Sequence, residues 1–169
     1  MSTSAAIAGT ESEDGALELY AGYLETLALI ERLHRLLLDV IKDEFDRLGR
    51  VDLNPVQALL LFNIGTKVVT AGELKNRGYY QGSNVSYNLK KLVELGYVDH
   101  QRCEIDRRSV RVRLTETGVE VHRIVAGLFQ RHAAELGGAD RLRSRGIDGM
   151  NRDLRSVERY WTDELRQLH

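Results

Sequence analysis

The sequence predicts a mainly α fold with one small β-hairpin, and three observations support this prediction. Apolar residues recur at steps of three and four over most of the chain, which is the period of an amphipathic helix. Glycine, proline and asparagine divide the middle of the chain into short helical segments. Residues 109–115 instead alternate polar and apolar side chains, as a half-buried strand does.

The first predicted element is a long amphipathic helix over residues 17–48, which ends near Gly49. Its apolar side chains begin with Leu17, Tyr20 and Leu24 and keep helical spacing to the end of the segment. Such a stripe can pack on the protein's own core or on another chain.

Three short helices follow. The first covers residues 54–65, where Asn54 can cap the helix and Pro55 suits its first turn. The second covers residues 70–78, with Thr70 as its candidate cap.

The third short helix covers residues 83–95, with Ser83 as N-cap and Gly96 as a left-handed exit. Its inward stripe consists of Val85, Leu89 and Leu92. The side chains that we expect to face outward are Ser83, Asn84, Ser86, Tyr87, Asn88 and Lys91.

A hairpin comes next, with strand-like segments at 97–105 and 109–115 and a tip between them. In the second segment Val110, Val112 and Leu114 share the inward face. The outward face then carries Ser109, Arg111 and Arg113.

Two helices over 117–136 and 147–168 complete the chain. The apolar side chains of the last helix recur at three and four residues, close to a heptad seam. We expect both ends of the chain to pair with a second copy, because a middle of about 65 residues is too small to cover them. The residues predicted at this interface are Leu17, Tyr20, Leu24, Ile147, Met150, Leu154, Val157, Trp161 and Leu165.

The resulting fold is a helix-turn-helix with a β-hairpin wing. We predict a flexible tail at residues 1–16 and an N-terminal dimerisation helix at 17–48. The winged helix-turn-helix follows at 49–116, and C-terminal dimerisation helices occupy 117–169.

Composition limits the class of protein. Apolar residues at 43% and charged residues at 29% are ordinary for a globular domain. The first 16 residues lack the basic start and apolar block of a signal peptide, and no apolar run approaches the roughly 18 residues that a membrane span needs. The single cysteine, Cys103, fits a reducing compartment. We therefore expect a cytoplasmic protein.

Charge is distributed unevenly along the chain. Nine basic and four acidic residues lie between Lys75 and Leu114, a net charge of +5, whereas the whole chain has a net charge of −1. A basic middle indicates an anionic partner, although a solvated charged surface would give the same count.

The outer helix face and the hairpin favour double-stranded DNA as that partner. Asparagine and serine can read base edges in the major groove, and lysine can hold phosphate. Arg107 and Arg108 at the hairpin tip suit a narrow minor groove, and Asp106 can orient one of them. Arg111 on the following strand faces solvent or the phosphate backbone.

Residues 54–115 resemble the winged helix-turn-helix of the MarR family of bacterial transcriptional regulators. The wing signature of the family is an Asp, a spacer, an Arg and a strand that leads to Leu-Thr. DRRSVRVRLT matches it at Asp106, Arg108, Leu114 and Thr115, and GSNVSYNLKKLVELGYV matches the recognition-helix pattern. The terminal helices also resemble the dimerisation region of the family.

The resemblance implies a homodimeric regulator, expected to be a repressor, on a pseudo-palindromic operator. It implies that Ser83, Asn84, Ser86 and Tyr87 approach bases, that Lys91 contacts phosphate, and that Arg108 enters the minor groove with support from Asp106. The chain departs from the pattern at Tyr87, where many members have a basic residue, so the base sequence that it reads cannot be transferred.

The resemblance also implies a small amphipathic effector bound between the dimer helices and the DNA-binding lobe. Its candidate liners, which plain core packing would explain as well, are His34, Leu37, Leu59, Phe62 and Phe129.

Other functions have weaker support. A redox role for Cys103, or a metal site with His100 and Glu104, lacks the surrounding pattern that either would need. No cofactor motif or catalytic constellation is present, so we expect no enzyme and no cofactor. A protein-protein adaptor and a nucleoid-type DNA binder of low specificity remain the alternatives.

Overall fold

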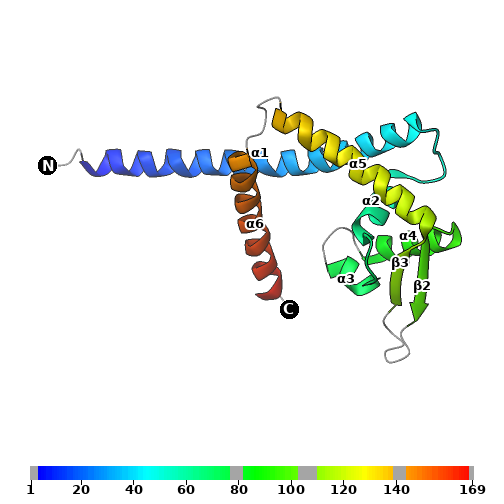
Figure 1. The fold of residues 1–169 in the computed structure, drawn as a ribbon. Coiled ribbons are helices and arrows are strands. Elements are labelled where there is room, and N and C mark those ends of the chain that lie inside the picture. The colour runs from blue at the N-terminus through cyan, green and yellow to red at the C-terminus, as the bar shows by residue number, and fades with distance from the viewer. Residues whose placement is uncertain (1–3, 77–81, 103–109, 139–143, 168–169) are drawn as a thin grey trace. The chain divides into compact units, whose positions relative to one another are not determined.

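The computed structural model describes residues 4–76, 82–102, 110–138 and 144–167 (Figure 1). The chain forms two compact units, Met1–His122 and Arg123–His169. Among the helices of the described residues, none is long and apolar enough to cross a membrane.

Helix α1 (Ser4–Arg47) is longer than expected. It includes residues 4–16, so the prediction of a flexible tail is wrong for that segment. This stretch contains four alanines and no proline, which favours a helix, whereas Gly9 and Gly15 lower its helix propensity. The predicted end is confirmed by Gly49, which adopts a φ of 68° after the last turn.

Helix α2 (Pro55–Ile64) has the cap that the sequence predicts. The side chain of Asn54 accepts a hydrogen bond of 2.8 Å from the backbone N–H of Gln57, and the Gln57 side chain accepts one from the Asn54 backbone. This reciprocal capping box satisfies two backbone donors that the helix cannot pair internally.

Helix α3 (Ala71–Asn76) follows a two-residue strand, β1 (Val69–Thr70), which the sequence analysis did not predict. The hydroxyl of Thr70 accepts a hydrogen bond from the Glu73 backbone, and the Glu73 carboxylate accepts one from the Thr70 backbone. The predicted role of Thr70 as a cap is therefore confirmed.

Helix α4 (Gly82–Glu94) leads through Gly96, with a φ of 79°, into the hairpin of β2 (Val98–Arg102) and β3 (Val110–Leu114). The sheet is antiparallel in the order β1-β3-β2, with β3 at its centre. Val98 pairs with Leu114 at the base of the hairpin. The wing, defined here as β2 and β3 with their connection, thus begins directly after α4.

The core of the first unit draws on all of these elements. Helix α1 packs on α2, α3 packs on α4, and α4 packs on β2. The largest fully buried side chains of the unit are Ile41, Leu60, Leu61, Leu74, Val85, Leu92, Val98, Val112 and Val121. The predicted winged helix-turn-helix fold is confirmed.

Helix α5 (Glu116–Gly138) begins in the first unit and continues into the second. Helix α6 (Ser144–Gln167) lies wholly in the second unit. Both helices were predicted, to within a few residues at each end. The predicted stripe on α6 remains exposed in the single chain, for instance at Leu154 and Leu165.

Candidate nucleic-acid interface

Helix α4 has one buried and one exposed face. Val85 and Leu92 are fully buried and Leu89 is nearly so, because their spacing places them on the side of the helix that meets the core. The opposite side exposes Asn84, Ser86 and Tyr87, and the Tyr87 side chain is 62% exposed. Three of the predicted base-contacting residues therefore share an open face.

Asn88 is a correction to the sequence analysis. It was expected to face outward, but it is only 9% exposed, and its amide Nδ2 donates a hydrogen bond of 2.9 Å to the backbone carbonyl of Asn84. The reason is helical geometry. Position 88 lies three residues after Val85 and four before Leu92, and therefore belongs to the buried stripe.

The two lysines of α4 differ in their partners. Lys91, the predicted phosphate contact, forms an ion pair with Glu94, with 3.1 Å between Nζ and Oε2. The hydrogen bond within this pair raises the pKa of Lys91. Lys90 is exposed and forms no ion pair or hydrogen bond with any residue that the structure describes. Lys90 was not predicted from the sequence, because either lysine could have reached Glu94 at helical spacing.

The sheet also has two different faces. His100 pairs with Val112, so both project from the face towards α4, whereas Arg111 and Arg113 project from the opposite face. Arg113 is held by Asp99 on the neighbouring strand, with 3.2 Å between Nη2 and Oδ2. Arg111 is exposed and has no such partner among the described residues.

A cleft of about 470 Å³ is lined by residues of both α4 and the wing. Its walls are mainly apolar and carry three ionisable side chains, Lys90, Glu94 and His100. The residues that line it are Ser86, Leu89, Lys90, Val93, Glu94, His100 and Val112.

The remaining predicted DNA contacts lie outside the described residues. They are Asp106, Arg107 and Arg108 at the hairpin tip and the side chain of Ser83. Cys103 and Glu104 also lie there, so the metal and redox hypotheses are not tested. Among the described residues, no group of three or more His, Cys, Asp or Glu could hold a metal ion.

None of the predicted effector liners borders the cleft between α4 and the wing. Leu59 is buried in the core, and the ring of Phe62 stacks on His122 with 5.3 Å between ring centroids. His34 is exposed on α1, beside the half-buried Leu37. Phe129 belongs to the second unit.

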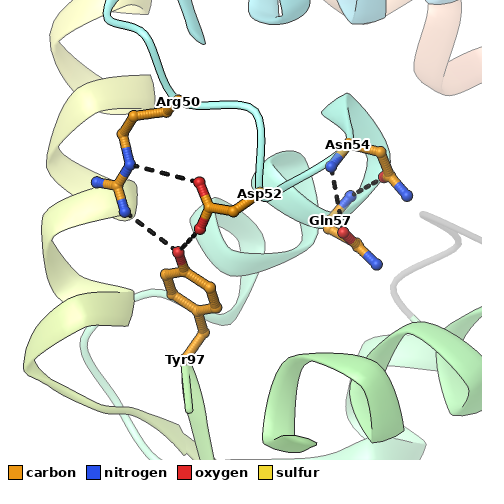
Figure 2. Close-up of polar contacts among 5 residues, drawn as sticks. All are labelled: Arg50, Asp52, Asn54, Gln57 and Tyr97. Atoms are coloured by element: carbon orange, nitrogen blue, oxygen red, sulfur yellow. Dashed lines mark hydrogen bonds and ion pairs between the residues drawn. The ribbon is translucent and has the colours of Figure 1, made fainter. Parts of the chain in front are cut away.

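The base of the wing contains a polar network that the sequence analysis also missed (Figure 2). The hydroxyl of Tyr97 donates a hydrogen bond to the carboxylate of Asp52 and accepts one of 3.2 Å from Nη2 of Arg50. Burial raises the pKa of the Tyr97 hydroxyl, and the bond to Asp52 raises it further. No local pattern signals a contact between residues 45 positions apart.

Comparison with known proteins agrees with this geometry. Residues 53–118 match the family model described as a winged helix DNA-binding domain. Over 149 residues the chain is 38% identical to the exopolysaccharide II synthesis transcriptional activator ExpG of Rhizobium meliloti. The aligned region covers 85% of this chain and 74% of that protein.

Solved structures share the fold. A MarR protein from Peptoclostridium difficile superposes with a TM-score of 0.69 at 18% identity, covering 85% of this chain and 91% of that one. FabT of Streptococcus pneumoniae, solved in complex with DNA, superposes with a TM-score of 0.61 at 21% identity, covering 83% and 98% of the two chains.

The fold and these relatives define a transcriptional regulator with a DNA-binding winged helix. The chain belongs to the MarR family of winged helix-turn-helix regulators.

Proposed function

We propose that the protein is a homodimer that binds a pseudo-palindromic operator in double-stranded DNA. Helix α4 enters the major groove with its exposed face, and the wing reaches the adjacent minor groove. The observation that carries this proposal is the division of α4 into a buried apolar stripe and an open polar face. That division presents hydrogen-bonding side chains on a helix whose position the core fixes.

The cations around α4 support the same arrangement. Lys90 on α4 and Arg111 on β3 have no partner among the described residues, and are therefore available to neutralise phosphates. The FabT structure, with the same fold, contains DNA. In a two-fold symmetric dimer the two copies of α4 would lie about one helical turn of DNA apart, ~34 Å.

Dimerisation is supported by apolar side chains that the single chain leaves uncovered. On α1, Leu17, Tyr20 and Leu24 are between 45% and 65% exposed. On α6, Ile147, Met150 and Leu165 are also exposed. Burial of such side chains against a second copy would remove apolar surface from water, which favours association.

The sign of regulation depends on where the operator lies relative to the promoter. The family resemblance of the sequence favours a repressor, whereas the name of the Rhizobium meliloti relative is that of an activator. A promoter fusion in the presence and absence of the regulator decides between the two. An amphipathic effector and a cytoplasmic location are parts of the same proposal.

Selection of bound fragments from the source genome tests the function. A regulator enriches a few promoters, a nucleoid-type binder enriches fragments without preference, and an adaptor enriches none. Arg108→Ala should then weaken binding to enriched and random duplexes alike and reduce the salt dependence of binding.

Arg113→Ala is the matched control for this experiment, because its guanidinium is already paired with Asp99. It should change affinity far less than Arg108→Ala. If the two variants behave alike, or if wild-type protein ignores every duplex in dilute buffer, the proposal is wrong.

A further inference from the structure

We propose that Tyr97 is a positioning residue for DNA binding. Through Asp52 and Arg50 it fixes the base of the wing to the segment between α1 and α2, and thereby sets where the wing meets DNA. This inference rests on the proposed function and deepens it. It assigns a role in DNA binding to three residues that do not themselves touch the duplex.

The backbone of Tyr97 lies where both strands of the wing leave the helices. Its carbonyl accepts a hydrogen bond of 3.1 Å from the backbone N–H of Thr115, the residue after β3. The hydroxyl of Thr115 donates a bond of 2.7 Å to the carbonyl of Gly96. Both ends of the hairpin therefore meet at Tyr97, and whatever holds this residue also holds the hairpin.

The side chain of Tyr97 is what connects this point to the rest of the unit. The residue is only 4% exposed, and its hydroxyl reaches the loop between α1 and α2. There it lies between the carboxylate of Asp52 and the guanidinium of Arg50, as Figure 2 shows. Nε of Arg50 lies 3.9 Å from Oδ1 of Asp52, so each of the three side chains contacts the other two.

The loop that receives Tyr97 is itself anchored to α1. The backbone N–H of Arg50 donates a hydrogen bond of 2.9 Å to the carbonyl of Phe45 in the last turn of α1. The hydroxyl of Tyr97 thus bonds to a rigid support, and this support is continuous with α1.

A small tilt at the base has a large effect further along the wing. From Val98 to Arg102 the strand extends ~13 Å at about 3.3 Å per residue. A tilt of about 10° would displace the far end of this strand by ~2 Å. Hydrogen bonds tolerate changes of only a few tenths of an ångström, so contacts between the wing and phosphate would be lost.

The experiment compares Tyr97→Phe and Asp52→Asn with Asn54→Ala. The control removes the cap of α2 in the same loop without touching Tyr97. Binding is measured by fluorescence anisotropy with labelled 30-base-pair duplexes, one of an enriched promoter sequence and one random, over a range of KCl concentrations. Thermal unfolding of each variant shows that it is folded at the temperature of the assay.

We expect Tyr97→Phe and Asp52→Asn to weaken binding to the enriched duplex about tenfold and to reduce the slope of log affinity against log salt by about one, as loss of a phosphate contact does. Asn54→Ala should lower the melting temperature at least as much and change affinity less than twofold. Asp52→Asn carries the test if Tyr97→Phe does not fold.

A double variant separates positioning from general destabilisation. Because Tyr97 acts through the wing, adding Tyr97→Phe to Arg108→Ala should weaken binding by less than a further twofold. Effects that multiply, or an equal loss of affinity in Asn54→Ala, would overturn the inference. So would unchanged binding by Tyr97→Phe in a protein whose wild type binds DNA, whereas a wild type that binds no DNA contradicts the proposed function itself.

Discussion

At the scale of single residues, the two lysines of α4 differ in whether an acidic side chain already pairs with them. Lys91 is engaged by Glu94, whereas Lys90 has no partner among the described residues and lines the cleft beside the wing. A phosphate can therefore bind Lys90 without displacing an acidic side chain.

We predict that Lys90→Ala weakens binding to any duplex about tenfold and lowers the salt slope by about one. Lys91→Ala should have a smaller effect, because Glu94 already neutralises that charge. Anisotropy titrations at several salt concentrations measure both. A larger effect of Lys91→Ala would show that Glu94 releases its lysine when DNA binds.

Tyr97 makes the stability of the folded protein depend on pH in the alkaline range. Burial raises the pKa of its hydroxyl, and the hydrogen bond to Asp52 adds to this effect. The folded chain therefore keeps this proton to a higher pH than the unfolded chain does. The stability that the buried hydroxyl contributes is complete below about pH 10 and is lost as the pH rises from there through the folded pKa.

The difference in melting temperature between wild type and Tyr97→Phe should accordingly be constant from pH 7 to pH 9 and shrink above about pH 10. Tyr160→Phe, at an exposed tyrosine of α6, is the control and should track wild type throughout. A difference that stays constant to pH 11 would mean that the Tyr97 hydroxyl is not held as the structure shows.

At the scale of elements, the junction between the wing and α5 depends on a glycine. A Cβ atom at Gly118 would lie 2.2 Å from the carbonyl oxygen of Tyr97, closer than any real contact. That carbonyl is the one that accepts a hydrogen bond from Thr115 at the base of the wing. The start of α5 can approach the wing only because position 118 has no side chain.

Gly118→Ala should therefore destabilise the protein by about 1–3 kcal/mol, as overpacking does. Gly127→Ala is a matched control in the same helix, where the nearest atom to the new Cβ is the flexible end of Arg131 at 3.7 Å. In Gly127→Ala the free energy of unfolding should rise by up to about 1 kcal/mol, because alanine has the higher helix propensity. Urea unfolding measures both, and equal effects would contradict the close approach.

Asn88 shows why the sequence of α4 alone does not specify which face of the helix is buried. Helical periodicity allows a buried stripe centred on Val85, Leu89 and Leu92 to include or exclude position 88. The structure includes it and satisfies its amide with the backbone carbonyl of Asn84. The rotation of α4 about its axis depends on what α3 and β2 place against it.

At the scale of the whole molecule, the exposed apolar stripe of α6 predicts assembly. Leu154 is 36% exposed in the single chain and lies within the stripe, whereas its neighbour Arg155 lies off it. A carboxylate at position 154 would place a charge inside the proposed interface between copies, where burial without a partner is costly.

Leu154→Glu should shift the protein from dimer to monomer in light scattering and weaken operator binding about a hundredfold, because two half-sites are no longer held together. Arg155→Glu makes a larger change of charge and should leave the mass unchanged. A dimeric Leu154→Glu variant, or a monomeric wild type, would contradict this prediction.

The sequence by itself determined the local structure of this protein. Caps at Asn54 and Thr70, the glycine exits and the change from helical to strand period depend on neighbours a few residues away, and the structure reproduces them. The winged helix could be predicted for that reason, and so could the inward position of Val112 and the outward position of Arg111.

Only the tertiary structure decided which side chains meet across long distances in the chain. The bond between Tyr97 and Asp52, the burial of Asn88 and the cleft beside Lys90 all require the relative placement of separate elements. The physical reason is that core packing, which fixes this placement, is a property of all the elements together. A local pattern records that a residue is polar, whereas its partners follow only from the assembled fold.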